Sequence, residues 1–156
     1  MSLGGWITIT LPNEVGHGHK NFPSAFVLGK RPIHFYPKPE REHRALVQAL
    51  LKEQWNQPPL LGAVQIHYLY EVPIPASWSK RKKELARQGK IRPTSTPDLS
   101  NLMYWMENRL KGILFQDDCQ VIFFSCREKY SDEPKTTILI QELLSPELNP
   151  PKTDST

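Results

Sequence analysis

Cysteine is scarce in this sequence, which holds only Cys119 and Cys126. Two cysteines cannot supply the disulfide framework of a small secreted domain. They stand seven positions apart on or near a segment that we expect to be a strand, and an odd offset places them on opposite faces. Because free cysteine is usually buried, we interpret both as free thiols of the core.

Long apolar runs are also missing. The longest, such as VIFF at 121–124, are far shorter than the roughly 20 residues that a membrane-spanning helix needs. The opening MSLGGWITIT lacks the basic and apolar regions of a signal peptide, so we expect a cytoplasmic protein. Its composition, 38% hydrophobic and 23% charged, fits one folded domain. We place that domain at 1–144 and a disordered, proline-rich tail at 145–156.

No charge of one sign dominates the whole chain, since the formal net charge is only +4. One segment, KRKKELARQGKIR at 80–92, is nevertheless strongly basic, with Glu84 as its single acid. Its basic residues are Lys80, Arg81, Lys82, Lys83, Arg87, Lys90 and Arg92. Such a run is either a solvated helix face or a surface for nucleic-acid phosphates. We favour phosphates, because basic residues recur on one helical face and acidic residues follow closely.

Four segments are predicted to be the main strands, and the first of them shows a clear period of two. They cover residues 5–12, 63–75, 121–130 and 136–143. A shorter strand is expected around 26–28, within a long loop at 13–37. In the second main strand, the residues that share one face are Val64, Ile66, Tyr68 and Tyr70. The polar SDEPK between the last two strands predicts a hairpin turn.

Three helices are expected between these strands. The first, at 39–55, starts at a proline, and its apolar stripe comprises Leu46, Ala49, Leu50 and Trp55. The second, at 77–88, has Ser77 or Ser79 as its N-cap and stops at Gly89.

The third helix runs over 99–111, with Asp98 as its N-cap and Gly112 at its end. Its buried stripe comprises Leu99, Leu102, Met103, Met106 and Leu110. This order of elements predicts an α+β fold, in which helices pack on a small mixed β-sheet.

Acidic residues flank the third helix, with Asp98 before it and Asp117 and Asp118 after it. Asp is common at N-caps and in turns, so these acids have an ordinary structural explanation. The alternative is a site for a hard divalent cation, which takes carboxylate oxygens and activates water for attack on a phosphodiester. Convergence of the three acids requires the helix and the following strand to pack antiparallel, with 112–116 carrying the chain back.

Two motifs lie within 97–121. The first comprises Pro97, Asp98, Leu99, Asn101 and Leu102. The second comprises Gly112, Asp117, Asp118, Gln120 and Val121. Together they resemble the RusA family of Holliday junction resolvases, often found on phages and prophages. That family shows Pro-Asp-x-Asp-Asn-Leu-x-Lys, then a helix, a Gly and Asp-Asp-x-Gln-Val/Ile. A looser likeness, through ITITLP at 7–12 and PASWSKRKK at 75–83, covers most of residues 6–143.

The resemblance implies a RusA-like single domain that acts as a Mg²⁺-dependent endodeoxyribonuclease, with Mn²⁺ as a substitute. Its substrate would be the four-way DNA junction of recombination and repair. The resemblance also implies that Asp98, Asp117 and Asp118 are catalytic and hold the metal. The basic segment 80–92 would contact the branched DNA. A homodimer is implied as well, since two symmetric cuts need one acidic cluster per strand.

The chain departs from the family pattern at two catalytic positions. Ser100 stands where the family has its second Asp, and Tyr104 stands where it has Lys. A hydroxyl is a weaker ligand for a hard cation, and tyrosine has no positive charge at neutral pH. Asn108 replaces a further Asp.

Three accounts of these departures stay open. In the first, Glu107 replaces the carboxylate and a nearby base replaces the cation, the bases available being Lys90, Arg92, Arg109 and Lys111. In the second, one metal site remains with slow chemistry. In the third, the protein is catalytically degenerate and binds branched DNA without cleaving it.

Two other features are lesser candidates. His17 and His19 lack the further ligands of a zinc site, so we interpret them as part of a polar loop in which His19 or Lys20 contacts phosphate. Tyr104 and Trp105 either fill the core or pack across a dimer interface.

Overall fold

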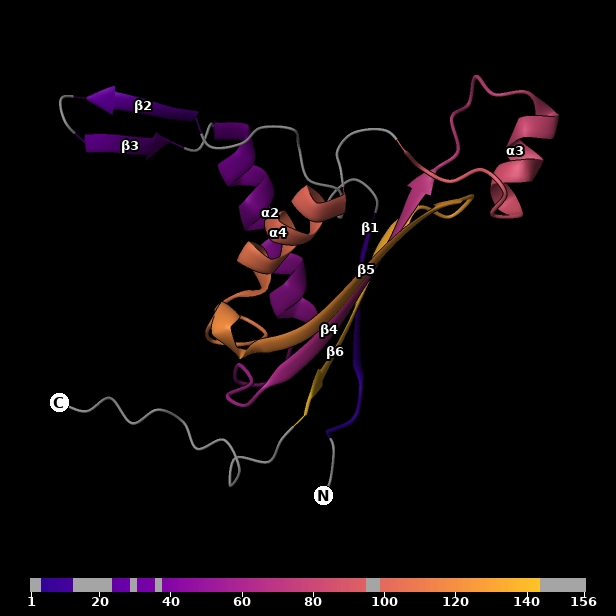
Figure 1. The fold of residues 1–156 in the computed structure, drawn as a ribbon. Coiled ribbons are helices and arrows are strands. Elements are labelled where there is room, and N and C mark those ends of the chain that lie inside the picture. Colours follow the sequence, from indigo (N-terminus) through magenta and orange to yellow (C-terminus); the bar gives the residue numbers. More distant parts are fainter. Residues whose placement is uncertain (1–3, 13–23, 29–30, 36–37, 95–98, 144–156) are drawn as a thin grey trace, which may run out of the picture.

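The protein folds as a mixed β-sheet with two helices on one face and a third helix beyond its end (Figure 1), so the predicted α+β class is confirmed. The computed structural model describes residues 4–12, 24–28, 31–35, 38–94 and 99–143. The elements are β1 (Ile7–Pro12), β2 (Ser24–Leu28), β3 (Arg31–Phe35), α2 (Lys38–Gln54), β4 (Val64–Pro73), α3 (Lys80–Arg87), α4 (Leu99–Leu110), the 3-10 helix η1 (Asp118–Gln120), β5 (Val121–Ser131) and β6 (Lys135–Glu142).

Four strands form the main sheet, in the order β1-β6-β4-β5. β6 pairs antiparallel with β1 and with β4, whereas β5 runs parallel to β4 at the edge of the sheet. Because parallel neighbours cannot be joined by a tight turn, the chain crosses over from β4 to β5 through α3 and α4. The loop that carries Asp117 and Asp118, here called the acidic loop, belongs to this crossover, and so does the basic segment 80–92.

The predicted hairpin between the last two strands is wrong. β5 and β6 are not neighbours, because β4 lies between them and pairs with both. The polar residues of SDEPK therefore pass across the end of β4 instead of reversing the chain between paired strands.

The core lies between the sheet and the two helices α2 and α4 (Figure 1). The strands contribute alternate residues, as their period of two predicted, and the fully buried ones are Ile9, Leu11, Val64, Ile66, Tyr70, Ile138 and Ile140. The helices contribute Val47, Leu51, Leu102, Met106 and Leu110. The face predicted for α4 is thus confirmed.

The stripe predicted for α2 is confirmed only in part: Trp55 is buried and Leu50 packs against the core, but Ala49 is exposed. Leu46 is 49% exposed, while the helix buries His43, Val47 and Leu51. The ring of His43 packs on that of Trp105, with ring centroids 5.0 Å apart. A buried histidine does not count as apolar in a sequence pattern, so His43 was left out of the predicted stripe.

The segment before α2 holds two strands where one was predicted. β2 and β3 pair antiparallel as a separate two-stranded sheet. β3 was missed because it contains Pro32, and proline is rare in strands except at sheet edges, which both strands of a pair provide.

The two cysteines form no disulfide. Cys126 is partly buried on β5, whereas Cys119 is exposed. The prediction that both are core thiols is therefore wrong for Cys119, because it lies in η1 ahead of the strand.

No helix in the described ranges is long and apolar enough to cross a membrane. The predicted tail at 145–156 lies outside the described residues.

Two buried tyrosines on β4 allow a matched test of this core. The Tyr70 hydroxyl donates a hydrogen bond to the Leu102 carbonyl at 3.1 Å, whereas the buried Tyr68 hydroxyl has no partner in the described part of the chain. We expect Tyr70→Phe to lower the free energy of unfolding by about 1 kcal/mol and Tyr68→Phe to leave it unchanged or raise it. Urea unfolding measures both, and equal losses would contradict the assignment.

Candidate metal and DNA site

The acidic pair, Asp117 and Asp118, lies in a tight loop between α4 and β5. α4 ends at Leu110, and Gly112 follows with a φ of +83°, a left-handed conformation that commonly ends helices. Leu114 and Phe115 then turn inward and are fully buried. This apolar anchor presents the next residues, including the acidic pair, at the surface.

Gln120 fixes the loop from its other side. Its Oε1 accepts hydrogen bonds from the backbone N–H groups of Gln116 and Asp117, each at 2.8 Å. Its Nε2 donates to the carbonyls of Leu60 and Gly62, at 2.8 and 2.9 Å. One side chain therefore ties the acidic loop to the segment that leads into β4. This gives a physical role to the Gln of the Asp-Asp-x-Gln motif.

The two carboxylates differ in their surroundings. Asp117 caps η1 by accepting a hydrogen bond from the backbone N–H of Cys119 at 3.0 Å. That bond, with the charge of Lys111, lowers the pKa of Asp117 to about 2. Asp118 pairs with the Lys111 ammonium at 3.1 Å, and the bond raises the pKa of Lys111. Asp117 is thus an exposed, ionised oxygen donor at neutral pH.

Among the groups predicted to compensate for the departures, Lys111 and Glu107 lie beside the pair. Burial, and then the charge of Asp118, raises the pKa of the half-buried Glu107. Arg109 lies elsewhere: it is buried, donates to the Trp105 carbonyl at 2.8 Å, and stacks 3.3 Å from the centroid of the Trp105 ring. Arg109 is therefore part of the core, and Lys111 is the cation that faces the acids.

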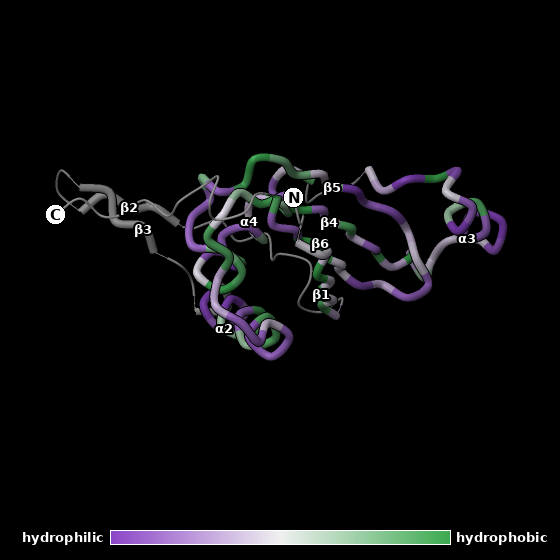
Figure 2. The backbone as a smooth tube through the Cα atoms, turned by 90° about the horizontal axis from the view of Figure 1, so that it is seen from below, coloured by the Kyte–Doolittle hydropathy of each residue, from purple (hydrophilic) through white to green (hydrophobic). Residues whose placement is uncertain are grey.

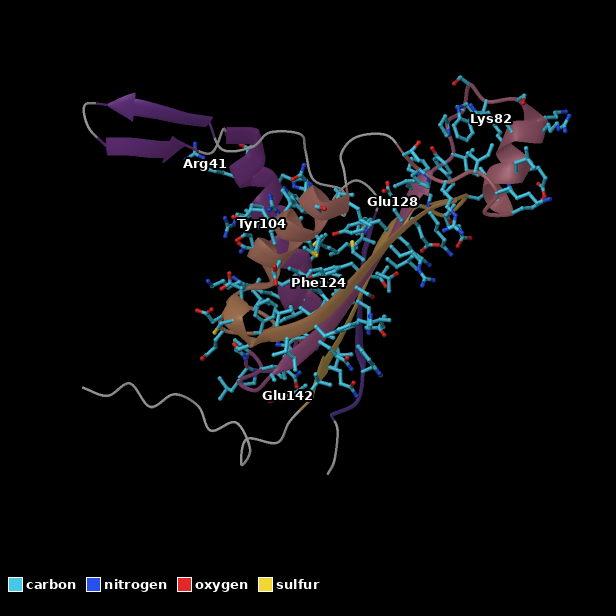
Figure 3. The ribbon with its side chains drawn as sticks, in the orientation of Figure 1. Arg41, Lys82, Tyr104, Phe124, Glu128 and Glu142 are labelled. Carbon is cyan, nitrogen blue, oxygen red and sulfur yellow. The ribbon has the colours of Figure 1, made fainter. Side chains whose placement is uncertain are left out.

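Of the two residues that depart from the family pattern, Ser100 lies in the first turn of α4 and Tyr104 lies near its middle. Ser100 is exposed near the start of the helix, and Tyr104, one turn later, is 65% exposed (Figure 3). The helix rises roughly 18 Å over its length, and the acidic pair adjoins its far end. Trp105 packs inward on His43, which agrees with the first of its two predicted roles, filling the core.

Four predicted site residues lie outside the described ranges: Asp98, His17, His19 and Lys20. The structure brings together Asp117 and Asp118, and the place of Asp98 in the site stays a prediction.

The described donors fit a hard cation. Mg²⁺ commonly takes one or two protein carboxylates and completes its shell with water and substrate phosphates. The exposed Asp117 and Asp118 meet that requirement with oxygen donors alone. Within the described ranges, no cluster of three His, Cys, Asp or Glu side chains could hold a metal. Water and substrate phosphates are the ligands that usually complete such a shell.

The basic segment lies far from the acidic pair in space. α3 starts at Ser79, whose Oγ accepts the Lys82 N–H at 3.2 Å, and Gly89 ends it with a φ of +73°. Figure 2 shows this hydrophilic helix beyond the end of the sheet. The acidic loop precedes the start of β5, and α3 packs at the other end of that strand, roughly 33 Å away at the usual rise per residue.

Two contacts join the α3 region to the end of β5, Arg87–Asp132 and Trp78–Tyr130, and two more lie within the α3 region itself. Arg87 bonds Asp132 at 2.8 Å and Glu84 at 3.3 Å. The Trp78 ring meets Tyr130 edge-on, with centroids 5.1 Å apart, and Lys82 lies 4.0 Å from the centre of the Trp78 ring. Arg87 and Lys82 thus have structural partners. The other exposed bases of the segment are Lys80, Arg81, Lys90 and Arg92, while Lys83 is partly buried.

Comparison with known proteins assigns this α+β fold and its acidic loop to the endodeoxyribonucleases. The family profile described as Endodeoxyribonuclease RusA matches residues 24–141. The chain belongs to the RusA family, as its two motifs predicted. The class comprises divalent-metal-dependent nucleases that act on branched DNA.

A relative in Bacillus subtilis (strain 168), named uncharacterized protein YqaN, is 34% identical over 86 residues. The match covers 54% of this chain and 61% of YqaN, so the chain spans about three fifths of that relative's length.

The role of Gln120 can be tested apart from any activity. Gln120→Ala removes four hydrogen bonds and leaves backbone groups of the loop and of the segment before β4 without these partners. We expect a loss of about 1–3 kcal/mol in the free energy of unfolding. Gln116→Ala, in the same loop, is the matched control and should stay within about 0.5 kcal/mol of the parent. Similar losses for both variants in a urea titration would refute the anchoring role.

Proposed function

We propose that this protein is a Mg²⁺-dependent endodeoxyribonuclease, active also with Mn²⁺, that resolves Holliday junctions in DNA recombination and repair. The observation that carries the proposal is the acidic pair of the family motif, exposed, hydrogen-bonded in place and paired with Lys111. A loop that is fixed on both sides holds its carboxylates without reorganisation when substrate arrives, and such preorganisation is where catalytic electrostatics acts.

In this proposal Asp98, Asp117 and Asp118 hold the cation. When bound, the ion polarises the scissile phosphate and lowers the pKa of water. Lys111 supplies the positive charge near the phosphate that Tyr104 cannot. Because Lys111 already pairs with Asp118 at 3.1 Å, it is placed without a separate ordering step. The exposed bases at 80–92 contact the DNA backbone.

A second candidate is a RusA-like protein that binds branched DNA without cutting it. The observation that favours it is the loss of charge at Ser100 and Tyr104, both exposed on α4 where substrate could meet them. Junction binding is common to both proposals, and cleavage separates them.

Cleavage of a labelled four-way junction in Mg²⁺ or Mn²⁺ tests the first proposal. We expect paired, symmetric cuts, and a fall in rate of roughly 100-fold or more in Asp118→Asn, the size expected for loss of a charge-stabilising group. Glu53→Gln, which removes an exposed acid from α2, is the control and should cut normally. Chelation by EDTA should abolish the cuts.

The same assay decides between the two candidates. Binding in Ca²⁺ without cuts in Mn²⁺ would contradict the nuclease and support the non-cleaving protein. Cuts that appear only in Ser100→Asp would identify the missing carboxylate as the cause.

The proposed enzyme acts as a homodimer, and the surface that supports this is the free edge of β5. In the described part of the chain β5 pairs only with β4. It exposes three consecutive apolar side chains, Ile122 at 61%, Phe123 at 52% and Phe124 at 49%. Val121–Phe123 is also the point at which the register with β4 shifts by one residue. An exposed apolar edge strand is an aggregation hazard unless another chain covers it.

Phe124→Lys on this edge (Figure 3) should convert the dimer to a monomer, because the isologous contact places two like charges together. Leu46→Lys is a matched control, since Leu46 on α2 is also 49% exposed but lies away from β5. Sedimentation velocity reports the change in mass. A monomeric parent protein, or a dimer that survives Phe124→Lys and not Leu46→Lys, would refute this interface.

A further inference from the structure

A cleft of about 410 Å³ lies between the end of α3 and the last residues of β5. The helix side is formed by Ala86, Arg87, Gly89, Ile91 and Arg92, and the strand side by residues 127–132. Glu128, labelled in Figure 3, is on the strand below α3. This cleft contains a basic residue, Arg127, that lies outside the basic segment.

Most charges around the cleft are already matched. Arg87 pairs with Asp132 at 2.8 Å, and Lys129 pairs with Glu71 at 3.5 Å. Glu128 is partly buried on the strand side, and burial raises its pKa. Two exposed guanidinium groups remain, Arg92 from the chain after α3 and Arg127 from β5. No ion pair involves either of them within the described ranges.

Two unmatched arginines that line one cleft make it electropositive, which favours binding of an anion there. The guanidinium fork suits phosphate, since it donates two parallel hydrogen bonds to a pair of oxygens. The cleft is open to solvent on a protein that belongs to a family of DNA nucleases, so the anion expected there is a backbone phosphate.

We propose that Arg92 and Arg127 together bind one phosphate of the DNA backbone in the cleft between α3 and β5. The inference rests on the proposed function for the identity of the anion. Arg127 lies six residues after Val121, or about 20 Å along β5, so this phosphate is distinct from any at the acidic pair of the same protomer. The contact reads no base, so it strengthens binding to linear and branched DNA alike.

The test is equilibrium binding by fluorescence anisotropy of the full chain in EDTA, over a range of salt. The probes are a linear duplex and a four-way junction. We expect Arg92→Gln and Arg127→Gln each to weaken binding of both probes by about 10-fold at low salt. Each should also lower the slope of log K against log salt by about 0.9. Because both residues hold one phosphate, the double variant should lose little more than either single variant.

Two controls isolate the cleft. Lys52→Gln removes the same charge from α2 and should leave the slope unchanged, and Arg127→Lys should retain the slope because it keeps the charge. Unchanged melting temperatures confirm that the variants fold. Three results would overturn the proposal that Arg92 and Arg127 share one phosphate. They are binding losses no larger than that of Lys52→Gln, additive losses in the double variant, and a parent protein that binds neither probe. If the parent protein binds the linear duplex as tightly as the junction and the variants lose affinity for the duplex, the shared phosphate site is supported and junction specificity is contradicted.

Discussion

The parallel pairing of β4 and β5 is the constraint on which the rest of the structure depends. Parallel strands start at the same edge of a sheet, so the chain that leaves the end of β4 must return along the whole length of the sheet before β5 begins. The basic helix α3 stays at the edge where β4 ends. α4 carries the chain back across the core, and the acidic loop arises where β5 begins. The pairing therefore separates the two segments that carry the predicted chemistry.

The acidic loop shows how a surface site is held by groups that have no part in chemistry. Leu114 and Phe115 anchor it in the core, and Gln120 makes two hydrogen bonds to the loop and two to the segment before β4. The charged residues then need only local partners, which Lys111 and the N–H of Cys119 provide. In this motif the acids are therefore candidate ligands, whereas the Gly and the Gln determine the conformation of the loop.

The sequence predicted what depends on local pattern. Local pattern located every main strand, and capping residues located α3, with Ser79 as one of the two predicted N-caps and Gly89 as the predicted stop. The sequence-based prediction failed where contacts between distant residues determine the structure. Nothing in SDEPK shows that β4 separates β5 from β6, and nothing around His43 shows that Trp105 packs on it. The prediction also assumed that the basic and acidic segments lie close together in space because they are close in the sequence. Arg127 was missed because a single base in a strand forms no pattern.

A two-fold contact along β5 would bring the separated segments together again. In an isologous contact the apolar run Ile122–Phe124 meets its own copy, and the two β5 strands lie antiparallel. The acidic loop, which precedes β5, then adjoins the later half of the other copy's strand. That half carries Arg127 and ends at the cleft below α3. Each proposed phosphate clamp would then serve the acidic pair of the opposite protomer. The predicted arrangement of acids beside a basic patch would then form between two protomers, although it does not form within one chain.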